Sequence, residues 1–471
     1  MSQRRHDIGL IGLGTMGRHL ALNIADHGYS VVGYEKDWRH VEVLREVAEG
    51  RNIQGAENLE ELVDRLRTPR AVMILVQAGP LVDAVIQKVI PHLEPGDLII
   101  DGSPSHFKDT NRRAVMLAEK GIHFLGVGIA GGEHGARYGP SLMPGGSAKG
   151  YERVQPIFEA IATKVDTEPC VAYLGPGSAG HYVKMVHDGI ESAFMQLIAE
   201  TYDLMKRGLG LTNSQLRAVY EQWNREELNS YLIEITAHIF RREDEKTGRW
   251  LIDVILDAAR QNGTEQWASQ EAMNLRVPVP TMDAAVVMRD LSIYKNERIA
   301  ASQILSGPSL AFRGERERFI HHLRQALHVG MILTYAQGMS LLRVASHAYG
   351  YELNLEDVAR IWRGGCTIRT ALLEGIRGAY IVQPNLLNPL TDAVLAQRLV
   401  TREQDLRVVV RMAVDLGIPV PGLMSALAYY DGYRSAWLPA NLIQAQRDYF
   451  GTHTYERVDA QGMFHTEWAL D

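Results

Sequence analysis

A stretch near the middle of the chain, residues 181–191, carries polar side chains of the kinds that perform acid–base chemistry. They are Lys184, His187, Asp188 and Glu191, whose spacings of three and four residues place them on one face of a helix. The residues between them are largely apolar, so the sequence predicts a helix that brings a lysine, an imidazole and two carboxylates together beside a hydrophobic surface. Taken alone, the stretch has a second interpretation as a solvent-exposed charged face.

The elements that must position this helix are of two kinds. Up to about Pro176, short apolar runs alternate with helical patterns, which is typical of a doubly wound, mostly parallel α/β domain. The expected strands are 8–11, 30–34, 71–76, 97–101 and 123–126, with helices such as 18–27 and 80–92 between them. After the glycine-rich residues 175–180, long helical patterns such as 325–347 and 394–416 continue to about Arg434.

A dinucleotide-binding motif follows the first expected strand. Gly12, Gly14 and Gly17 form the pattern GxGxxG and open a helix. The first glycine permits a tight turn, the second lets a pyrophosphate approach the backbone, and the third permits close packing of helix and strand. We therefore expect a nicotinamide dinucleotide at the end of the first strand.

The end of the second strand bears on which dinucleotide binds. A carboxylate at Glu35 can accept hydrogen bonds from both adenosine ribose hydroxyls and would repel a 2′-phosphate, which favours NAD. Lys36 could pair with a 2′-phosphate, which favours NADP. We expect NAD to be preferred and leave NADP open as the alternative.

The bulk composition describes a globular protein of more than one domain. The chain has 471 residues, 46% of them hydrophobic, and a formal charge of −7 without any basic block, so neither nucleic acid nor a membrane is an expected partner. No apolar run reaches the roughly 18–20 residues that span a bilayer. Its cysteines, Cys170 and Cys366, cannot form a disulfide framework, which favours the cytoplasm. No HExxH pattern or cysteine cluster is present, so no metal is expected.

An internal repeat lies inside the helical part. His181, His187 and Gly189 recur as His322, His328 and Gly330, and both copies continue into an apolar helix. The second copy has Gln325 and Ile332 in place of Lys184 and Glu191. The similarity is either chance or the trace of a duplicated helical unit whose first copy alone kept the reactive pair.

Several strings of residues together resemble a known family. Residues 130–146, AGGEHGARYGPSLMPGG, resemble a signature of the decarboxylating 6-phosphogluconate dehydrogenases. The helix with Lys184 and Glu191 is similar to that family's catalytic helix, and residues 362–366, 430–433 and 444–453 also match. The resemblance covers nearly the whole chain. It implies a Rossmann-type domain at 1–178, a duplicated all-helical domain at 179–435, and a tail at 436–471 that reaches into the partner subunit of a homodimer.

The resemblance also implies a reaction and roles for individual residues. The family oxidises 6-phosphogluconate at C3 and decarboxylates it to ribulose 5-phosphate and CO2. Lys184 is the expected base, which requires a lowered pKa, and Glu191 the expected acid, which requires a raised one. The expected substrate-binding residues are Gly131 and Gly132 for the carboxylate, His187 for a hydroxyl group, Asp188, and, for the phosphate, Thr264 and Arg289 together with Arg447 and His453 from the tail of the partner subunit. The expected cofactor-binding residues are Gly12, Gly14, Met16, Gly17, Glu35, Lys36, Val76 and Gln77.

The chain departs from the family's pattern at residues of the pocket. Ala130 replaces a serine, Asp188 and Pro104 each replace an asparagine, Ser192 replaces a tyrosine, Asn262 and Gln77 each replace a lysine, and residues 35–37 replace Asn-Arg-Thr. The loss of a lysine at Asn262 removes a cation from the phosphate subsite. A pair between Asp188 and Lys184 would raise the lysine's pKa and make it a worse base.

Three hypotheses follow from these residues. The first is an NAD-preferring 6-phosphogluconate dehydrogenase, motivated by the retained Lys184 and Glu191. The second is a divergent oxidative decarboxylase for a related 3-hydroxy sugar acid, motivated by the changes at the substrate pocket. The third is a catalytically silent relative that binds a dinucleotide or a protein.

Overall fold

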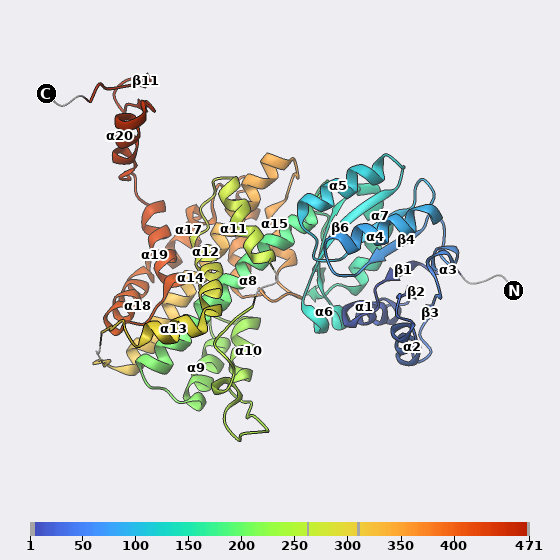
Figure 1. Ribbon diagram of the computed structural model, residues 1–471, viewed down its shortest axis with the longest axis horizontal. Helices are drawn as coiled ribbons and strands as arrows, with labels where there is room; N and C mark the ends of the chain where they lie inside the picture. The colour runs from blue at the N-terminus through green and yellow to red at the C-terminus, as the bar shows by residue number, and fades with distance from the viewer. Residues whose placement is uncertain (1–4, 261–262, 309–310, 469–471) are drawn as a thin grey trace.

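The computed structural model describes residues 5–260, 263–308 and 311–468, and its N-terminal part is built on one twisted sheet (Figure 1). The sheet has the strand order β3-β2-β1-β4-β5-β6-β7, and only the last pair is antiparallel. Its strands are β1 (Ile8–Ile11), β2 (Val31–Tyr34), β3 (Ile53–Gly55), β4 (Ala71–Ile74), β5 (Leu98–Asp101), β6 (His123–Ala130) and β7 (Ser141–Gly146). The doubly wound, mostly parallel sheet predicted from the sequence is confirmed.

Helices cover both faces of this sheet. They are α1 (Thr15–Asp26), α2 (Trp38–Val47), α3 (Leu59–Asp64), α4 (Pro80–Val89), the 3-10 turn η1 (Ile90–His92), α5 (Phe107–Ala118), α6 (Gly132–Tyr138) and α7 (Ala148–Ile161). Alternate strand residues pack into two separate cores. Leu10 and Met73 belong to one core, whereas Ile11 and Val72 belong to the other. The strands are buried on both sides, which explains their continuous apolar runs.

The parallel strands all end at the same edge of the sheet. The glycine loop follows β1, Glu35 follows β2, Val76 and Gln77 follow β4, and Gly131 follows β6. Ligands of open α/β sheets bind beyond the carboxyl ends of the strands, so the topology collects the expected cofactor residues at one place.

The second part of the chain is helical and is organised around two long helices that pack side by side, α8 (Ala179–Asp203) and α14 (Arg316–Tyr349) (Figure 1). The short hairpin β8 (Lys164–Val165) and β9 (Glu168–Pro169) precedes it. Around the two long helices lie η2 (Leu204–Gly208), α9 (Asn213–Arg225), α10 (Tyr231–Ile239), η3 (Leu251–Asp253), α11 (Thr264–Asn274), α12 (Pro280–Ile293), α13 (Lys295–Ser302), α15 (Leu355–Ile361), α16 (Leu372–Val382), η4 (Pro389–Thr391), α17 (Ala393–Val400), α18 (Glu403–Leu416) and α19 (Pro421–Tyr433).

The two halves of the helical part share a second feature that supports the duplication. Helices α12 and α19 each begin with a proline, and the preceding residues, Val279 and Val420, have nearly the same backbone angles, φ −128° and ψ 49° against φ −133° and ψ 56°. Helix α12 packs on α8 and α19 packs on α14, and the two helices also pack on each other. The long helices and their proline-initiated partners thus form two similar pairs.

The C-terminal segment projects from the helical body (Figure 1). It consists of α20 (Ala440–Gly451) and a small hairpin of β10 (Tyr455–Glu456) and β11 (Met463–Phe464). Most of its side chains are exposed, but the carboxylate of Asp448 is fully buried and accepts hydrogen bonds from His465, Trp468 and two backbone N–H groups. The tail therefore has a polar centre rather than a hydrophobic core.

Some element boundaries differ from those expected. The helical pattern at 394–416 is two helices, α17 and α18, because Thr401 and Arg402 turn the chain between them. Strands β3 and β7 were not predicted, the first because it is only three residues long and the second because it is rich in glycine and proline. Within the described residues, no helix is both long and apolar enough to cross a membrane.

Candidate active site

A cavity of about 680 Å³ lies where the carboxyl edge of the sheet meets α8 and α11. Its walls come from the first turns of α1, α5 and α11, from the loops after β4 and β5, from the end of β6 and the turn that follows it, from α8, and from Thr367 in the loop before α16. The cavity therefore brings together segments separated by more than 300 residues of sequence.

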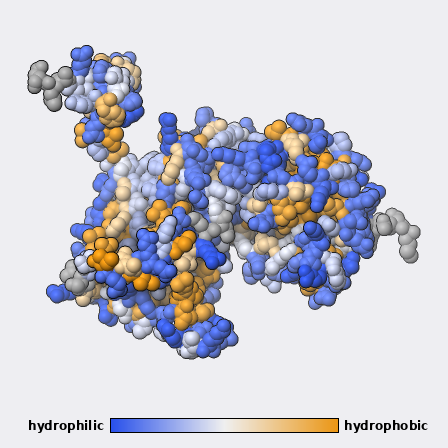
Figure 2. All heavy atoms as spheres, viewed as in Figure 1, coloured by the Kyte–Doolittle hydropathy of each residue, from blue (hydrophilic) through white to orange (hydrophobic). Residues whose placement is uncertain are grey.

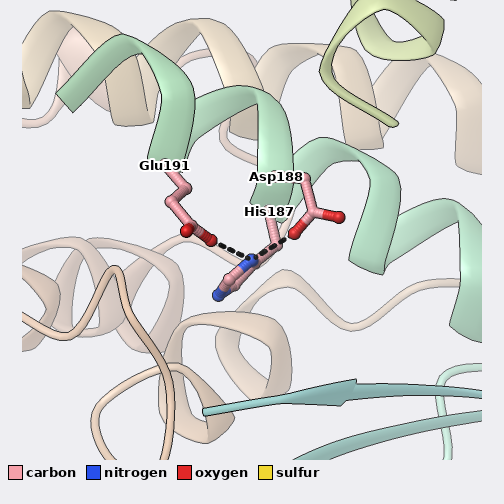
Figure 3. A group of neighbouring side chains, drawn as sticks. All are labelled: His187, Asp188 and Glu191. Carbon is pink, nitrogen blue, oxygen red and sulfur yellow. Dashed lines mark hydrogen bonds and ion pairs between the residues drawn. The ribbon is translucent and has the colours of Figure 1, made fainter. Parts of the chain in front are cut away.

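The four polar residues of α8 face this cavity together. Because a carboxylate only accepts, Nδ1 of His187 must carry a hydrogen, and it donates to Oδ1 of Asp188 at 3.0 Å. The same nitrogen lies 3.8 Å from Oε2 of Glu191, so the imidazole sits between the two carboxylates (Figure 3). The alternative of a solvent-exposed face is excluded, because His187 is fully buried and Asp188 is only 9% exposed.

Lys184 donates to Asp188 one turn along the same helix. Burial alone would lower the pKa of Lys184, but the negative charges of Asp188 and Glu191 outweigh it, and the pKa is raised. Burial likewise favours neutral Asp188, yet the ammonium of Lys184 and the hydrogen bond from His187 hold the pKa of this carboxyl low. In this structure, Asp188 therefore opposes the lowered lysine pKa that the sequence required of a base.

Glu191 has a partner that sequence reasoning missed. The hydroxyl of Thr367 donates to Oε2 of Glu191 at 2.6 Å. Thr367 directly follows Cys366, whose buried thiol has its pKa raised by burial. Residues 362–366 match the family's sequence pattern, but the recognised string ends one residue before Thr367. It is the hydroxyl of Thr367 that orients the carboxylate of Glu191, the candidate acid.

The glycine loop after β1 has the geometry that its spacing predicts. A Cβ at Gly12 would lie 2.2 Å from the carbonyl oxygen of Leu75, and a Cβ at Gly17 would lie 1.9 Å from the carbonyl oxygen of Gly12. A Cβ at Gly14 would meet nothing within 4 Å, so space is open where the N-terminus of α1 presents its N–H groups. An anion can approach the backbone at this point.

The carboxylate of Glu35 is fixed against the same loop. Its Oε2 accepts from the backbone N–H of Leu13 at 3.1 Å, and its Oε1 accepts from the N–H of Lys36 at 2.8 Å. Of the other expected cofactor residues, Met16, Val76 and Gln77 line the cavity, as does Pro104. These residues fit a dinucleotide that enters along the sheet edge.

The expected carboxylate-binding glycines form a tight turn at the cavity wall. Gly131 has φ 105° and Gly132 has φ 60°, both in the region that favours glycine. A Cβ at Gly131 would lie 2.4 Å from the carbonyl oxygen of Gly365, so the turn packs directly against the backbone of residues 362–366. Gly132 begins α6, and N–H groups in this first turn lack partners within the helix.

The expected phosphate-binding residues are only partly assembled. Thr264 lines the cavity, and Arg289 of α12 donates from Nη1 to Oε1 of Glu265 at 2.8 Å. Asn262 lies outside the described residues. Arg447 and His453 are on the projecting tail and are not among the residues that line the cavity of their own subunit (Figure 1).

Two substituted positions have different environments. Ala130 lines the cavity beside Gly131. Ser192 is not among the lining residues, is buried, and its hydroxyl has no hydrogen-bond partner among the described residues. Besides Thr367, the lining residues that sequence reasoning missed include Glu265, Trp267, His106 and Asp109, which lack any motif of their own.

One group of side chains among the described residues has a spacing that could hold a metal ion. Ligand atoms of His187, Asp188 and Glu191 lie within 4.8 Å of one another (Figure 3). The ammonium of Lys184 already contacts Oδ1 of Asp188, so a cation here would compete with the lysine. The sequence-based expectation of no metal stays a prediction.

Comparison with known proteins gives matches along nearly all of the chain. The NAD binding domain of 6-phosphogluconate dehydrogenase matches residues 7–175, and the C-terminal domain of 6-phosphogluconate dehydrogenase matches residues 180–468. A relative from Bacillus subtilis, described as "6-phosphogluconate dehydrogenase, NADP(+)-dependent, decarboxylating", is 50% identical over 465 residues, covering 98% of this chain and 99% of its own. A decarboxylating 6-phosphogluconate dehydrogenase from Escherichia coli is 48% identical over 465 residues, with the same coverage.

A solved structure has the same overall fold. The 6-phosphogluconate dehydrogenase of Plasmodium falciparum, described in its apo form and in complex with NADP+ and with 6-phosphogluconate, superposes with a TM-score of 0.95. It is 42% identical and covers 98% of this chain and 100% of its own.

Proposed function

The chain belongs to the 6-phosphogluconate dehydrogenase family, and on this premise we propose that it converts 6-phosphogluconate to ribulose 5-phosphate and CO2, with NAD or NADP as the hydride acceptor. The observation that carries the proposal is the shared cavity wall: Lys184 and Glu191 of α8 line the same cavity as Met16 of the glycine loop and Gly131. The third hypothesis, a catalytically silent relative, is disfavoured because the chain keeps both members of the acid–base pair, Lys184 and Glu191, at the cavity.

In the proposed mechanism, N–H groups at Gly131 and Gly132 bind the substrate carboxylate, and the side chains of His187 and Asp188 hold a hydroxyl group. Neutral Lys184 takes the proton of the C3 hydroxyl. When bound, the nicotinamide accepts the hydride from C3. The ammonium of Lys184 then stabilises the negative charge that develops on the C3 oxygen as CO2 leaves. Glu191, held by Thr367, donates a proton to C1 of the enediol.

The proposal is tested by assaying the purified protein with 6-phosphogluconate and either cofactor. We expect reduction of the cofactor with release of ribulose 5-phosphate and CO2, and a loss of about 10²–10⁴ in kcat in Lys184→Ala. Lys206→Ala is the control, because Lys206 forms an ion pair with Asp253 away from the cavity. A wild-type protein that reduces neither cofactor contradicts the proposal.

For the cofactor, we propose that NAD is preferred and that NADP is also used. Support comes from Glu35, whose carboxylate is held by Leu13 at the position that would face the ribose hydroxyls. The NADP-dependent relative from Bacillus subtilis is the finding that speaks against a strict NAD requirement.

We further propose a homodimer in which each tail reaches the cavity of the other subunit. Exposed apolar side chains support it: Figure 2 shows apolar surface at the base of α20 and around α12 and α13, where Leu442, Ile443, Val287 and Ile299 are exposed. Arg447 and His453 would then complete the phosphate site that their own subunit leaves incomplete.

Subunit complementation tests the exchange of tails. A Lys184→Ala subunit keeps its tail, and a subunit without residues 436–471 keeps Lys184. Each alone should be inactive. Mixed dimers should recover activity, because one site then combines an intact Lys184 with a tail from the other subunit. Mixtures as inactive as their components would contradict the exchange.

Two proposals concern the whole chain. The domain boundary at 178 is supported by the short gap between the two matched family domains, the first of which ends at 175 while the second begins at 180. The boundary at 435 lies inside the second matched domain and is supported instead by the end of α19 at Tyr433 and by the projecting C-terminal segment (Figure 1). Limited proteolysis should cut near both positions.

A cytoplasmic location is supported by two cysteines that are free and buried, and cell fractionation tests it.

A further inference from the structure

One wall of the cavity is the N-terminal end of α11. Thr264 and Glu265 lie in its first turn and line the cavity, and Gly263 precedes them in a left-handed conformation with φ 95°. Free N–H groups and the positive end of the helix dipole make such a position favourable for an anion. In this chain the anion already present is the carboxylate of Glu265.

Glu265 contacts the two side chains of its own subunit, Arg289 and Thr264, that the family resemblance assigns to the substrate phosphate. Nη1 of Arg289 donates to its Oε1 at 2.8 Å, and the hydroxyl of Thr264 donates to its Oε2 at 3.4 Å. The side chains of Arg289 and Glu265 are each only 13% exposed, so the pair is largely removed from water. The guanidinium is therefore neutralised by a residue of its own chain.

The charges of the cavity wall strengthen this effect. Among the described residues that line the cavity, Asp109, Asp188, Glu191 and Glu265 are acidic, whereas Lys184 is the one lysine or arginine. Lys184 is itself paired with Asp188. A dianionic phosphate that enters this subunit's cavity must displace Glu265 from Arg289 or lie beside its negative charge, and like charges repel strongly where water is scarce.

We propose that Glu265 is a specificity-determining residue that lowers the site's preference for a phosphate over a hydroxyl group at the far end of the sugar acid. The inference rests on the proposed function, because Arg289 and Thr264 form a terminal subsite only if a sugar acid occupies the cavity. A neutral terminal hydroxyl can donate a hydrogen bond to the carboxylate of Glu265 without displacing it. The enzyme then also oxidises an unphosphorylated six-carbon aldonic acid.

The chemistry of this further activity is that of the main reaction. Lys184 takes the hydroxyl proton at C3, the hydride passes to the cofactor, the C1–C2 bond breaks to release CO2, and Glu191 supplies one proton to the remaining five-carbon enediol. The aldonate and the oxidised cofactor thus become a ketopentose, CO2 and the reduced cofactor, with no other reactant.

The first test compares kcat/KM for 6-phosphogluconate and gluconate in wild type and Glu265→Gln. The amide removes the negative charge at nearly constant volume. We expect the ratio of the two values to rise at least about tenfold in the variant, mainly through a lower KM for 6-phosphogluconate. Glu221→Gln is the matched control, because Glu221 also pairs with arginines, Arg217 and Arg241, but on the surface of α9. An unchanged ratio overturns the proposal.

The second test needs no turnover. Trp267 lines the cavity close to Glu265, so its fluorescence can report the binding of inorganic phosphate to the protein with cofactor bound. Glu265→Gln should bind phosphate at least about tenfold more tightly than wild type, and Trp267→Phe should remove the signal. Equal affinities overturn the proposal. Tighter phosphate binding in a protein that oxidises neither acid would instead refute the proposed function and leave the role of Glu265 standing.

Discussion

Lys184 and Asp188 form an ion pair across one turn of α8, inside the cavity where Lys184 would act as the base. The pair ties the protonation state of the lysine to a carboxylate that the family's pattern does not have at this position. A base must be neutral to accept a proton, whereas this carboxylate favours the ammonium. The rate of oxidation should therefore depend on pH in a way that Asp188 controls.

The variant Asp188→Asn tests this dependence. Because Asp188 raises the pKa of Lys184, the neutral lysine that acts as base forms only at high pH. The basic limb of the wild-type pH profile, along which kcat/KM rises with pH, should therefore lie at high pH. Removal of the carboxylate should move this limb to lower pH and increase kcat/KM at neutral pH by on the order of tenfold. Asp203→Asn is the control, since Asp203, the last residue of α8, pairs at the same spacing with Arg207 of η2. Identical limbs in wild type and Asp188→Asn would refute the coupling.

Thr367 should matter for the protonation of C1 because it holds Glu191. Thr367→Val removes the hydrogen bond at nearly constant volume and should lower kcat by about tenfold while KM for the substrate changes less. Thr367→Ser keeps the hydroxyl and should restore kcat. Steady-state kinetics of the two variants decides the matter, and a serine variant as slow as the valine variant would speak against positioning by the hydroxyl.

Glu35 should set the cofactor preference. Glu35→Gln removes the charge that would repel a 2′-phosphate, so kcat/KM for NADP relative to NAD should increase by about tenfold or more. The measurement is initial rates over a range of each cofactor. Glu42→Gln, an exposed position on α2, serves as the control. A ratio that does not change would show that another residue selects the cofactor.

Asp448 should organise the tail. Its buried carboxylate accepts hydrogen bonds from His465, Trp468, Thr454 and Thr466, and so joins α20 to the residues that precede β10 and follow β11. Asp448→Ala should therefore disorder the tail, which we expect to lower both activity and the dimer fraction in size-exclusion chromatography with light scattering. Asp459→Ala is the control, because Asp459 forms an exposed pair with Arg457. A fully active dimeric variant would contradict this role.

Arg113 and Asp101 should contribute strongly to stability. Both are fully buried, and Arg113 also donates to Ser105 and to the carbonyl oxygen of Gly79, which joins two loops at the cavity. Arg113→Met leaves the carboxylate unpaired and should lower the free energy of unfolding by about 3–5 kcal/mol. Arg112→Met, which breaks an exposed pair with Asp83, should cost about 1 kcal/mol or less. Urea unfolding measures both, and equal losses would show that burial of the pair is unimportant.

The sequence by itself determined the layout of the fold and the reacting pair. Strand β1 was predicted to the residue, and the glycine loop was placed correctly after it, because both depend on local patterns of hydrophobicity and turn geometry. The spacing of Lys184, His187, Asp188 and Glu191 fixed their common face, because a helix repeats every 3.6 residues wherever it is placed. The repeat between His181 and His322 likewise pointed to the paired helices α8 and α14.

The tertiary structure decided what surrounds these groups. Thr367 lies 176 residues from Glu191 along the chain, and Glu265 meets Arg289 through the packing of α11 on α12, so neither contact has a sequence signal. The sequence also left open the direction in which the pKa of Lys184 shifts, because burial lowers this pKa and nearby carboxylates raise it. Only the distances in the folded chain determine which of the two is larger.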